Sequence, residues 1–336
     1  MFTINKSVSV WEQLVQLPFL NLYSRLLNAA MELDVFSQLC QPVTAEALAV
    51  HMGWHKANTE YLLSALVSIG FLNKTDGTNQ NTEEVDRYLV KGKDEYLGGF
   101  LPFYMQEGMA PMDVKLLVTK GPQSQQQEAM EQQLDFASFA QRMRQAQEGY
   151  RQQELLRIVR SLPENDQIRR VLDLGGATGL LGLAVIGDRP DRTGVLFDRF
   201  PPAVVEESIS LMGLTDRTEV MCGNFMADRI GERYDLILAL NVMLFAKGRM
   251  EELLKKCYDA LNPGGVLLVI SEAILPDHTG PWDMVMGYLP YYFQGMDMGV
   301  LKNEVSDAAV RVGFTKCEKR TECLCSGTQD IDIIRK

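Results

Sequence analysis

The sequence is poor in cysteine, with six scattered over 336 residues. These are too few and too widely spaced for a disulfide scaffold. Only Cys323 and Cys325 lie close together, and on a strand their side chains would point to the same side. No nearby histidine or further cysteine completes a ligand set for a metal. We therefore expect two packed thiols and no metal site.

Long apolar runs are also absent. No stretch approaches the roughly 20 uninterrupted apolar residues that a bilayer-spanning helix needs. The first residues, "MFTINKSVSVWEQL", lack the apolar run after a basic start that marks a secretory signal. These two observations favour a cytoplasmic protein without a membrane partner.

Positive charge is in deficit: 33 Lys and Arg face 44 Asp and Glu, for a net charge of −11. A nucleic-acid partner calls for a basic face, so this class of partner is disfavoured. The apolar content of 46% and the charged content of 23% are those of an ordinary globular protein. A chain of this length fits two domains better than one.

Residues 1–110 read as a helical domain. Three stretches with apolar residues at helical spacing, "FLNLYSRLLNAAMELDVFSQL", "TAEALAVHMGW" and "KANTEYLLSALVSIGFL", precede a hairpin signal at Asp76-Gly77. Three helices and a hairpin are the order of a winged helix. A DNA-binding use would need basic or amide groups on the third helix, which offers little beyond Lys56 and Asn58. A dimerisation or packing module is therefore favoured over a DNA-binding regulator.

Residues 111–165 are expected to form connecting helices that line a substrate pocket. Phe136, Phe139, Met143 and Tyr150 stand at helical spacing there. Such a stripe is usually plain core, but between two domains it would lie where small-molecule pockets form.

Residues 166–336 alternate between strands and helices. The strands "RRVLDL", "TGVLFD", "TEVMCG", "YDLILAL" and "GVLLVISEAIL" are separated by helical stretches. This rhythm predicts an α/β fold, a Rossmann-like doubly wound and mostly parallel sheet. The last two segments, "TKCEKRTECLC" and "DIDIIRK", are expected to close it as an antiparallel pair.

A nucleotide half-site is expected after the first of these strands. Gly175, Gly176 and Gly179 stand at the strand-to-helix turn, where glycine permits a tight bend and a close approach to a ligand. The dinucleotide fingerprint G-x-G-x-x-G is absent, which weakens an NAD reading. Asp198 ends the second strand, where an acid can accept hydrogen bonds from ribose hydroxyls. A half-site without a pyrophosphate loop points to S-adenosylmethionine as cofactor. Asn241, at the carboxyl end of a later strand, is a further candidate contact.

With these motifs, the chain resembles the S-adenosylmethionine-dependent small-molecule methyltransferases of the caffeate and hydroxyindole O-methyltransferase type. The resemblance covers nearly all of the chain and includes "NLYSRLLNAAMELDVF", "GNFM", "LNPGG" and "SEAILP". It implies a homodimer with interlocking winged helices and a substrate that is aromatic or polyketide-like. It also implies that Gly175 lies beside the methionine part of the cofactor, that Asp198 holds the ribose, and that Asn224 and Phe225 flank the adenine. The family usually has Asp where Asn224 stands, but an amide can still accept from the adenine amino group.

The resemblance fails at the catalytic base. The family's His-Asp-Trp run after the fourth strand aligns with Leu244, Phe245 and Ala246, and leucine cannot take a proton. One supporting carboxylate is kept as Glu272, whereas the second falls near Gly299. The acids nearest to that position in the sequence are Asp297 and Glu304.

Two readings of the acceptor side stay open. Glu272 could act as base or as substrate anchor, and His278, on a loop after the fifth strand, could replace the missing base. Weaker candidates are Lys247, Tyr288, Tyr291 and Tyr292. The segment 281–299 is rich in Met and aromatic residues, and we expect it to line an apolar pocket, with core or dimer contact as the alternative. The expected substrate-lining residues are Phe139, Met143, Met243, Leu244, Met286 and Tyr291.

The function expected from all of this is methyl transfer to a small, largely apolar and flat molecule. Oxygen is the acceptor by family habit, and nitrogen, sulfur or carbon stay open because Leu244 replaces the base. A second possibility is an enzyme of this fold that binds the cofactor without transferring its methyl group. A third is a ligand-sensing regulator that binds DNA through the winged helix.

Overall fold

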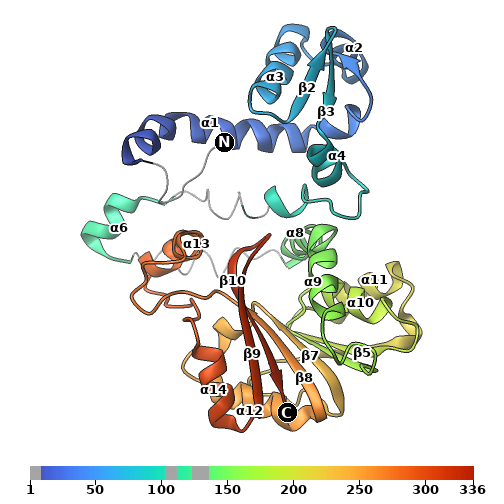
Figure 1. Ribbon diagram of the computed structural model, residues 1–336, viewed down its shortest axis with the longest axis vertical. Coiled ribbons are helices and arrows are strands. Elements are labelled where there is room, and N and C mark those ends of the chain that lie inside the picture. The colour runs from blue at the N-terminus through green and yellow to red at the C-terminus, as the bar shows by residue number, and fades with distance from the viewer. Residues whose placement is uncertain (1–8, 103, 105–111, 123–135) are drawn as a thin grey trace. The chain divides into compact units, whose positions relative to one another are not determined.

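A computed structural model describes residues 9–102, 104, 112–122 and 136–336. The chain forms two compact units, residues 1–107 and residues 108–336 (Figure 1). The first division expected from the sequence, at residue 110, lies close to this one. The connecting helices expected over 111–165 belong to the second unit.

The first unit has the expected order of three helices and a hairpin. Its elements are α1 (Val10–Glu32), η1 (Phe36–Gln38), β1 (Val43–Thr44), α2 (Ala45–Met52), α3 (Lys56–Ser68), β2 (Leu72–Thr75), β3 (Thr78–Asn81) and α4 (Glu83–Leu89). Ser9 and Glu12 form a capping box that starts α1. Asp76 and Gly77 both have positive φ, 50° and 80°, as a two-residue hairpin turn between twisted strands requires. The predicted winged-helix order is confirmed.

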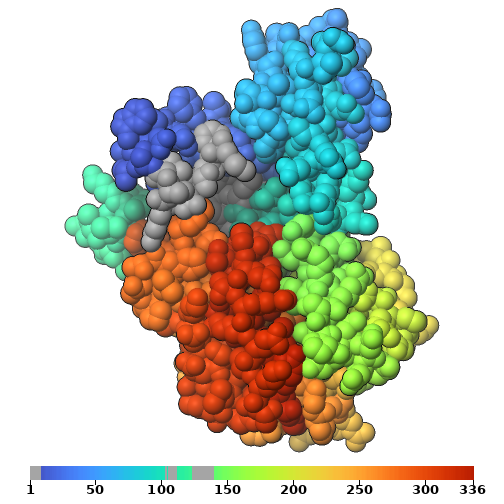
Figure 2. Space-filling model, in the orientation of Figure 1, coloured from blue at the N-terminus to red at the C-terminus, as the bar shows by residue number. Residues whose placement is uncertain are grey.

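The second unit contains a seven-stranded sheet. Its strands are β4 (Arg170–Leu174), β5 (Thr193–Asp198), β6 (Thr218–Cys222), β7 (Tyr234–Leu240), β8 (Leu261–Ser271), β9 (Lys316–Leu324) and β10 (Gly327–Arg335). Their order is β6-β5-β4-β7-β8-β10-β9. The first five strands pair in parallel, and β10 runs antiparallel to β8 and β9. The predicted doubly wound sheet with a closing antiparallel pair is confirmed, and Figure 2 shows that pair, in red, on one face of the unit.

Helices cover both faces of this sheet. The helices described in the second unit are α6 (Val114–Lys120), α8 (Phe136–Gln147), α9 (Tyr150–Arg160), α10 (Leu180–Gly187), α11 (Pro202–Leu211), α12 (Met250–Ala260), α13 (Trp282–Phe293) and α14 (Glu304–Val312), with the short turns η2 (Thr215–Arg217) and η3 (Met243–Ala246). Alternate side chains of each strand enter different cores, as period-two pleating requires. On β4, Leu172 packs with Leu253 of α12, whereas Val171 packs with Leu183 of α10.

The topology fixes where a ligand would bind. The chain runs outward from β4 through β5 to β6, and then returns to place β7 on the other side of β4. At such a switch point the loops after the two central strands diverge and leave a crevice at their carboxyl ends. Gly175 follows β4 and Asn241 follows β7, so the predicted cofactor residues lie at this crevice.

Within the described residues, no helix combines the length and the apolar character that crossing a membrane requires. The same residues contain no group of three or more His, Cys, Asp or Glu side chains arranged to hold a metal ion.

Candidate functional site

The turn after β4 requires its glycines. Gly175 has φ of +74°, and a Cβ there would lie 2.5 Å from Cγ1 of Val242. Gly179 has φ of +80°, and its Cβ would lie 2.6 Å from Cδ1 of Leu196. Left-handed backbone and close packing both exclude side chains. The turn is therefore a tight backbone cradle, as the sequence predicted.

Asp198 lies beside this cradle at the end of β5. Its Oδ2 accepts a hydrogen bond from the amide of Ala177 at 2.7 Å, and its Oδ1 accepts one from the amide of Phe200 at 3.0 Å. A carboxylate has about four acceptor positions, so two remain for hydroxyl donors. The partly buried Asp198 thus braces the turn and keeps acceptor capacity for a ribose.

Asp173, which sequence reasoning missed, lies under the cradle. It is 1% exposed, and its Oδ2 accepts from the amide of Gly182 at 3.1 Å. A Cβ on Gly176 would overlap this carboxyl group. Burial raises the pKa of Asp173 to about 7. An acid inside an otherwise apolar strand directly before the glycines was the signal that could have identified it.

Gln147, at the end of α8, is a second residue that the sequence did not reveal. It is 4% exposed; its Nε2 donates to the carbonyl of Gly176 at 3.0 Å, and its Oε1 accepts from Oγ1 of Thr178 at 2.6 Å. Both ends of the amide are therefore satisfied, and α8 is tied to the cradle.

The other residues that the sequence predicted on this helix lie in different places. Met143 packs against Ala177 and Phe200, so it lies on the cofactor side of the site. The side chain of Phe139 lies outside the described residues. Tyr150 is not on the same helix, because the chain breaks at Gly149, whose φ is +68°, and α9 starts afresh.

The segment after β6 carries Asn224 and Phe225, the two residues expected beside the adenine. Phe225 is 8% exposed, and its ring lies 3.4 Å from where a Cβ of Gly175 would stand. Asn224 is exposed; its Oδ1 accepts from the amide of Met226 at 3.0 Å, which fixes the turn. Lys256 of α12 donates to the carbonyl of Phe225 at 2.5 Å and holds the loop from the opposite side.

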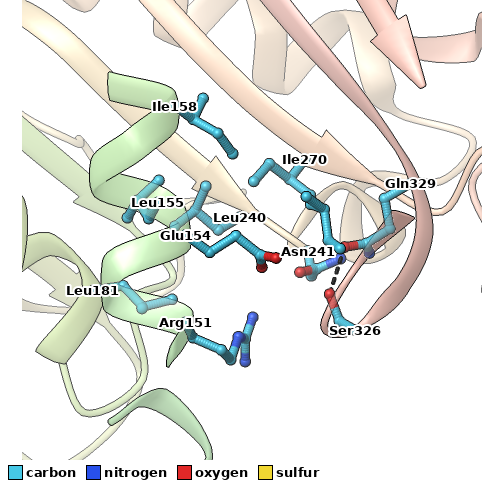
Figure 3. A pocket seen from close by; sticks show the side chains of 11 residues that line it. Arg151, Glu154, Leu155, Ile158, Leu181, Leu240, Asn241, Ile270, Ser326 and Gln329 are labelled. Carbon is cyan, nitrogen blue, oxygen red and sulfur yellow. Dashed lines mark hydrogen bonds between the residues drawn. The ribbon is translucent and has the colours of Figure 1, made fainter. Parts of the chain in front are cut away.

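Asn241 follows β7 with φ of 55°, and its backbone amide donates to the carbonyl of Ile270 at 2.9 Å. It borders a cavity of about 20 Å³, enough for about one water molecule. Figure 3 shows Glu154 of α9 and Gln329 of β10 lining the same cavity. Glu154 also accepts from the amide and thiol of Cys325, at 3.1 and 3.2 Å, and so anchors the β9–β10 turn.

Cys325 itself is an inert thiol. Burial raises its pKa to about 12, so it keeps its proton. Within the described residues, Cys323 and Cys325 belong to no group of three or more side chains that could hold a metal ion.

The tight turn η3 carries Met243 and Leu244, which were expected to line the substrate pocket, followed by Phe245. Met243 is fully buried in the core, so it does not line a pocket. Leu244 is partly buried and Phe245 is 61% exposed. With about three residues per turn, Met243 and Ala246 point to the same side, inward. Leu244 packs partly against the same core, and Phe245 points outward.

Glu272 follows β8 and is 1% exposed. Its Oε1 accepts a hydrogen bond from the hydroxyl of Tyr288 on α13 at 2.6 Å. Burial raises the pKa of Glu272, and the Tyr288 bond and the nearby Asn241 oppose that rise. The Oε2 atom is buried and makes no hydrogen bond.

The two acids near Gly299 are used elsewhere. Asp297 pairs with Lys247 at 2.6 Å, and the same ammonium donates to the carbonyl of Gly299 at 2.6 Å. Glu304 accepts from the amide of Leu301 at 2.9 Å.

The remaining predicted residues lie along α13 or beside it. His278 is exposed in the turn after β8, where its ring meets the Tyr292 ring edge to face at 5.3 Å. Met286 is 57% exposed, and the Tyr291 ring lies 5.9 Å from that of Tyr288. Thus the structure gathers Glu272, Tyr288 and Tyr292 at one place and leaves the imidazole in a solvent-exposed turn.

Comparison with known proteins adds two family matches. An O-methyltransferase domain matches residues 122–304, more than half of the chain, and an O-methyltransferase dimerisation domain matches residues 15–91.

Individual relatives act on different atoms. A 3-hydroxy-5-methyl-1-naphthoate 3-O-methyltransferase of Streptomyces sahachiroi is 26% identical, over 77% of this chain and 76% of its own. A bacteriochlorophyllide d C-20 methyltransferase of Chlorobaculum tepidum is 26% identical, over 92% of this chain and 89% of its own. Human N-acetylserotonin methyltransferase, solved in complex with S-adenosylmethionine, has the same fold, with a TM-score of 0.73, 20% identity and 99% coverage of both chains.

Proposed function

The chain belongs to the O-methyltransferase family, and from this premise we propose that it binds S-adenosylmethionine and methylates a small, largely apolar molecule. We further propose that the acceptor atom is a nucleophile which needs no base from the protein. Apolar lining from α13 favours a flat, conjugated molecule as the acceptor.

The cofactor half of the proposal is supported by the cradle and Asp198. Gly175 lets the backbone approach a ligand where any Cβ would collide with Val242, and Asp198 keeps free acceptor positions for ribose hydroxyls. Phe225 borders the same turn as an apolar wall for adenine. When bound, the sulfonium supplies an electrophilic methyl group.

The acceptor half of the proposal rests on Leu244, which the resemblance aligns with the family's histidine. An in-line displacement gains much of its acceleration when the two reacting atoms are held at the right distance and angle. A general base typically adds about 10²–10⁴-fold for a poorly acidic alcohol or phenol. An aryl thiol, an acidic phenol, an amine or an activated carbon needs that base less. The role of Leu244 and Phe245 would be to exclude water and to position such an acceptor.

We propose a homodimer formed through the first unit. α1 carries many exposed apolar side chains: Val10, Trp11, Leu14, Val15, Leu17, Phe19 and Leu22. Trp11 is 71% and Leu22 65% exposed, and a contiguous apolar face of this kind marks a protein contact. The dimerisation-domain match supports a second copy as the partner. We do not expect a nucleic-acid partner, in view of the net charge of −11.

A panel of matched acceptors tests this function. The full-length protein is incubated with S-adenosylmethionine and thiophenol, phenol or aniline at pH 7.5, and S-adenosylhomocysteine is measured by mass spectrometry. We expect thiophenol to be methylated about 100-fold faster than phenol, because it ionises without help. Equal rates would contradict an acceptor that needs no base.

Two other outcomes would favour the alternatives. Tight cofactor binding without S-adenosylhomocysteine formation, on this panel and on small molecules that copurify with the protein, would favour an enzyme that does not transfer methyl. Salt-sensitive DNA binding in a gel shift would favour a regulator.

A further inference from the structure

Glu272 presents an unused acceptor at the carboxyl end of β8. Its Oε1 holds the Tyr288 hydroxyl at 2.6 Å, but its Oε2 is buried without a hydrogen bond. Leaving a polar acceptor buried and unpaired is costly, so such an atom in a native protein calls for a partner that completes it. Within the described residues Glu272 forms no ion pair, and the ammonium group of Lys247 is engaged by Asp297 and by the Gly299 carbonyl.

A second unused oxygen lies on the next turn of α13. The hydroxyl of Tyr292 is buried and has no hydrogen-bond partner. A Cβ on Gly299 would overlap this hydroxyl, so the phenol occupies the space that a side chain at position 299 would fill. The resemblance to the family places its second carboxylate near this position. Burial, together with the charges of Asp297 and Glu272, raises the pKa of Tyr292 to about 12, so the hydroxyl keeps its proton.

The chain has thus replaced the polar groups of the acceptor side in a consistent way. By the resemblance, Leu244 takes the position of the base, Glu272 keeps one carboxylate, and the Tyr292 hydroxyl lies near the position of the other. Tyr288 fixes the orientation of Glu272 from the same helix that supplies Tyr292, one turn apart. The ring centroids of the two tyrosines lie 6.5 Å apart.

We propose that Glu272 and Tyr292 form a polar anchor in the acceptor site, positioned by Tyr288, and that this anchor selects molecules carrying an O–H or N–H group besides the atom to be methylated. The inference rests on the proposed methyl transfer and adds the chemical feature by which the acceptor is recognised. Glu272 Oε2 accepts from that group, and the Tyr292 hydroxyl donates to its lone pair.

An anchor fits the geometry of Glu272 better than a base does. The Tyr288 hydrogen bond stabilises the charged carboxylate and therefore weakens it as a proton acceptor. The same bond fixes the direction of Oε2, and a fixed direction is what selective recognition of one group requires. A site built to pair a hydroxyl rejects analogues that lack it.

Two aryl thiols test the anchor. 4-Mercaptophenol carries the extra hydroxyl, and 4-methoxythiophenol has the same shape without the donor; both thiols ionise without a base. With the full-length protein and S-adenosylmethionine, we expect kcat/KM to be about 10- to 100-fold higher for 4-mercaptophenol, mainly through KM. Comparable activity on both, within twofold, would overturn the anchor while leaving methyl transfer intact. Methylation of neither would overturn both proposals.

Variants separate anchor from base. In Glu272→Gln the amide oxygen keeps the Tyr288 bond and the NH₂ group takes the place of Oε2, so a donor would meet a donor. We expect this variant to lose the preference for 4-mercaptophenol over 4-methoxythiophenol. Tyr288→Phe should weaken the preference several-fold, and Tyr292→Phe provides an independent test if Glu272→Gln does not fold. Tyr258→Phe, a phenol removed from α12, is the control that should retain the full preference.

Two results would contradict the anchor. An equal fall of kcat by 100-fold or more on both thiols in Glu272→Gln, with KM unchanged, would show a base and overturn the anchor. So would a structure of the protein with S-adenosylhomocysteine and 4-mercaptophenol in which Asn241 donates to Oε2.

Discussion

The cofactor side and the acceptor side of the site lie at the same edge of one sheet but are built differently. On the cofactor side Asp173, Asp198 and Gln147 all have protein partners, and the glycine turn has no room for variation. On the acceptor side Glu272 and Tyr292 each keep a buried oxygen without a partner. The comparison indicates that the polar groups of the cofactor side are already paired within the protein, as suits a fixed ligand. The acceptor side keeps unpaired oxygens for a molecule that differs from one family member to the next.

The largest effect that tests this comparison is expected at Asp198. Asp198→Ala removes the acceptors for the ribose hydroxyls and also the brace of the Ala177 amide. A hydrogen bond to a charged group contributes about 1.5–3 kcal/mol, so cofactor affinity should fall about 10- to 150-fold in isothermal titration. Asp198→Asn, which keeps one acceptor oxygen, should lose less. Unchanged affinity in the alanine variant would refute the ribose assignment.

The sequence predicted the glycine turn and the acid at the end of β5 because these signals are local. A positive φ at Gly175 and an acid at a strand end follow from a few neighbouring residues. The partners of those residues did not, because the contact of Asp173 with Gly182 and that of Gln147 with Gly176 depend on how strand, helix and turn pack.

The acceptor side was harder to predict for the same reason. The resemblance predicts that the base is absent at Leu244, whereas the inward position of Met243 follows from the tight turn that only the structure shows. The pairing of Tyr288 with Glu272 joins a helix to a strand end, and no spacing rule predicts it.

A smaller effect concerns the buried acid beneath the cradle. Asp173 has a folded pKa of about 7, above that of the unfolded chain. The folded state therefore binds more protons between about pH 4 and 7, and the stabilising contribution is lost as the pH rises through 7. Asp173→Asn removes this titration and keeps an acceptor for the Gly182 amide. We expect the Tm of the cofactor-free variant to gain several °C on the wild type between pH 5 and pH 8, since about 1 kcal/mol shifts the Tm of a large domain by about 2–4 °C.

Measuring the Tm over the same pH range also tests the acceptor side. Burial raises the pKa of Glu272 too, so Glu272→Gln should change the pH dependence of the Tm with the same sign. Melting curves that stay parallel to the wild type from pH 5 to 8 in Asp173→Asn would contradict the burial argument.

The smallest change is expected where the missing base would be restored. Leu244→His places an imidazole at the family position, but a catalytic histidine also needs a group that orients it. The family's Asp position is Phe245, which is 61% exposed and cannot accept the second ring proton. An acceptor that carries its own electron density also has little use for a base. We therefore expect the rate with thiophenol, and with the protein's own acceptor, to change by less than about threefold. A gain of 100-fold or more with its own acceptor would mean that the absent base is a handicap, and that the open contacts at Glu272 and Tyr292 do not compensate for it.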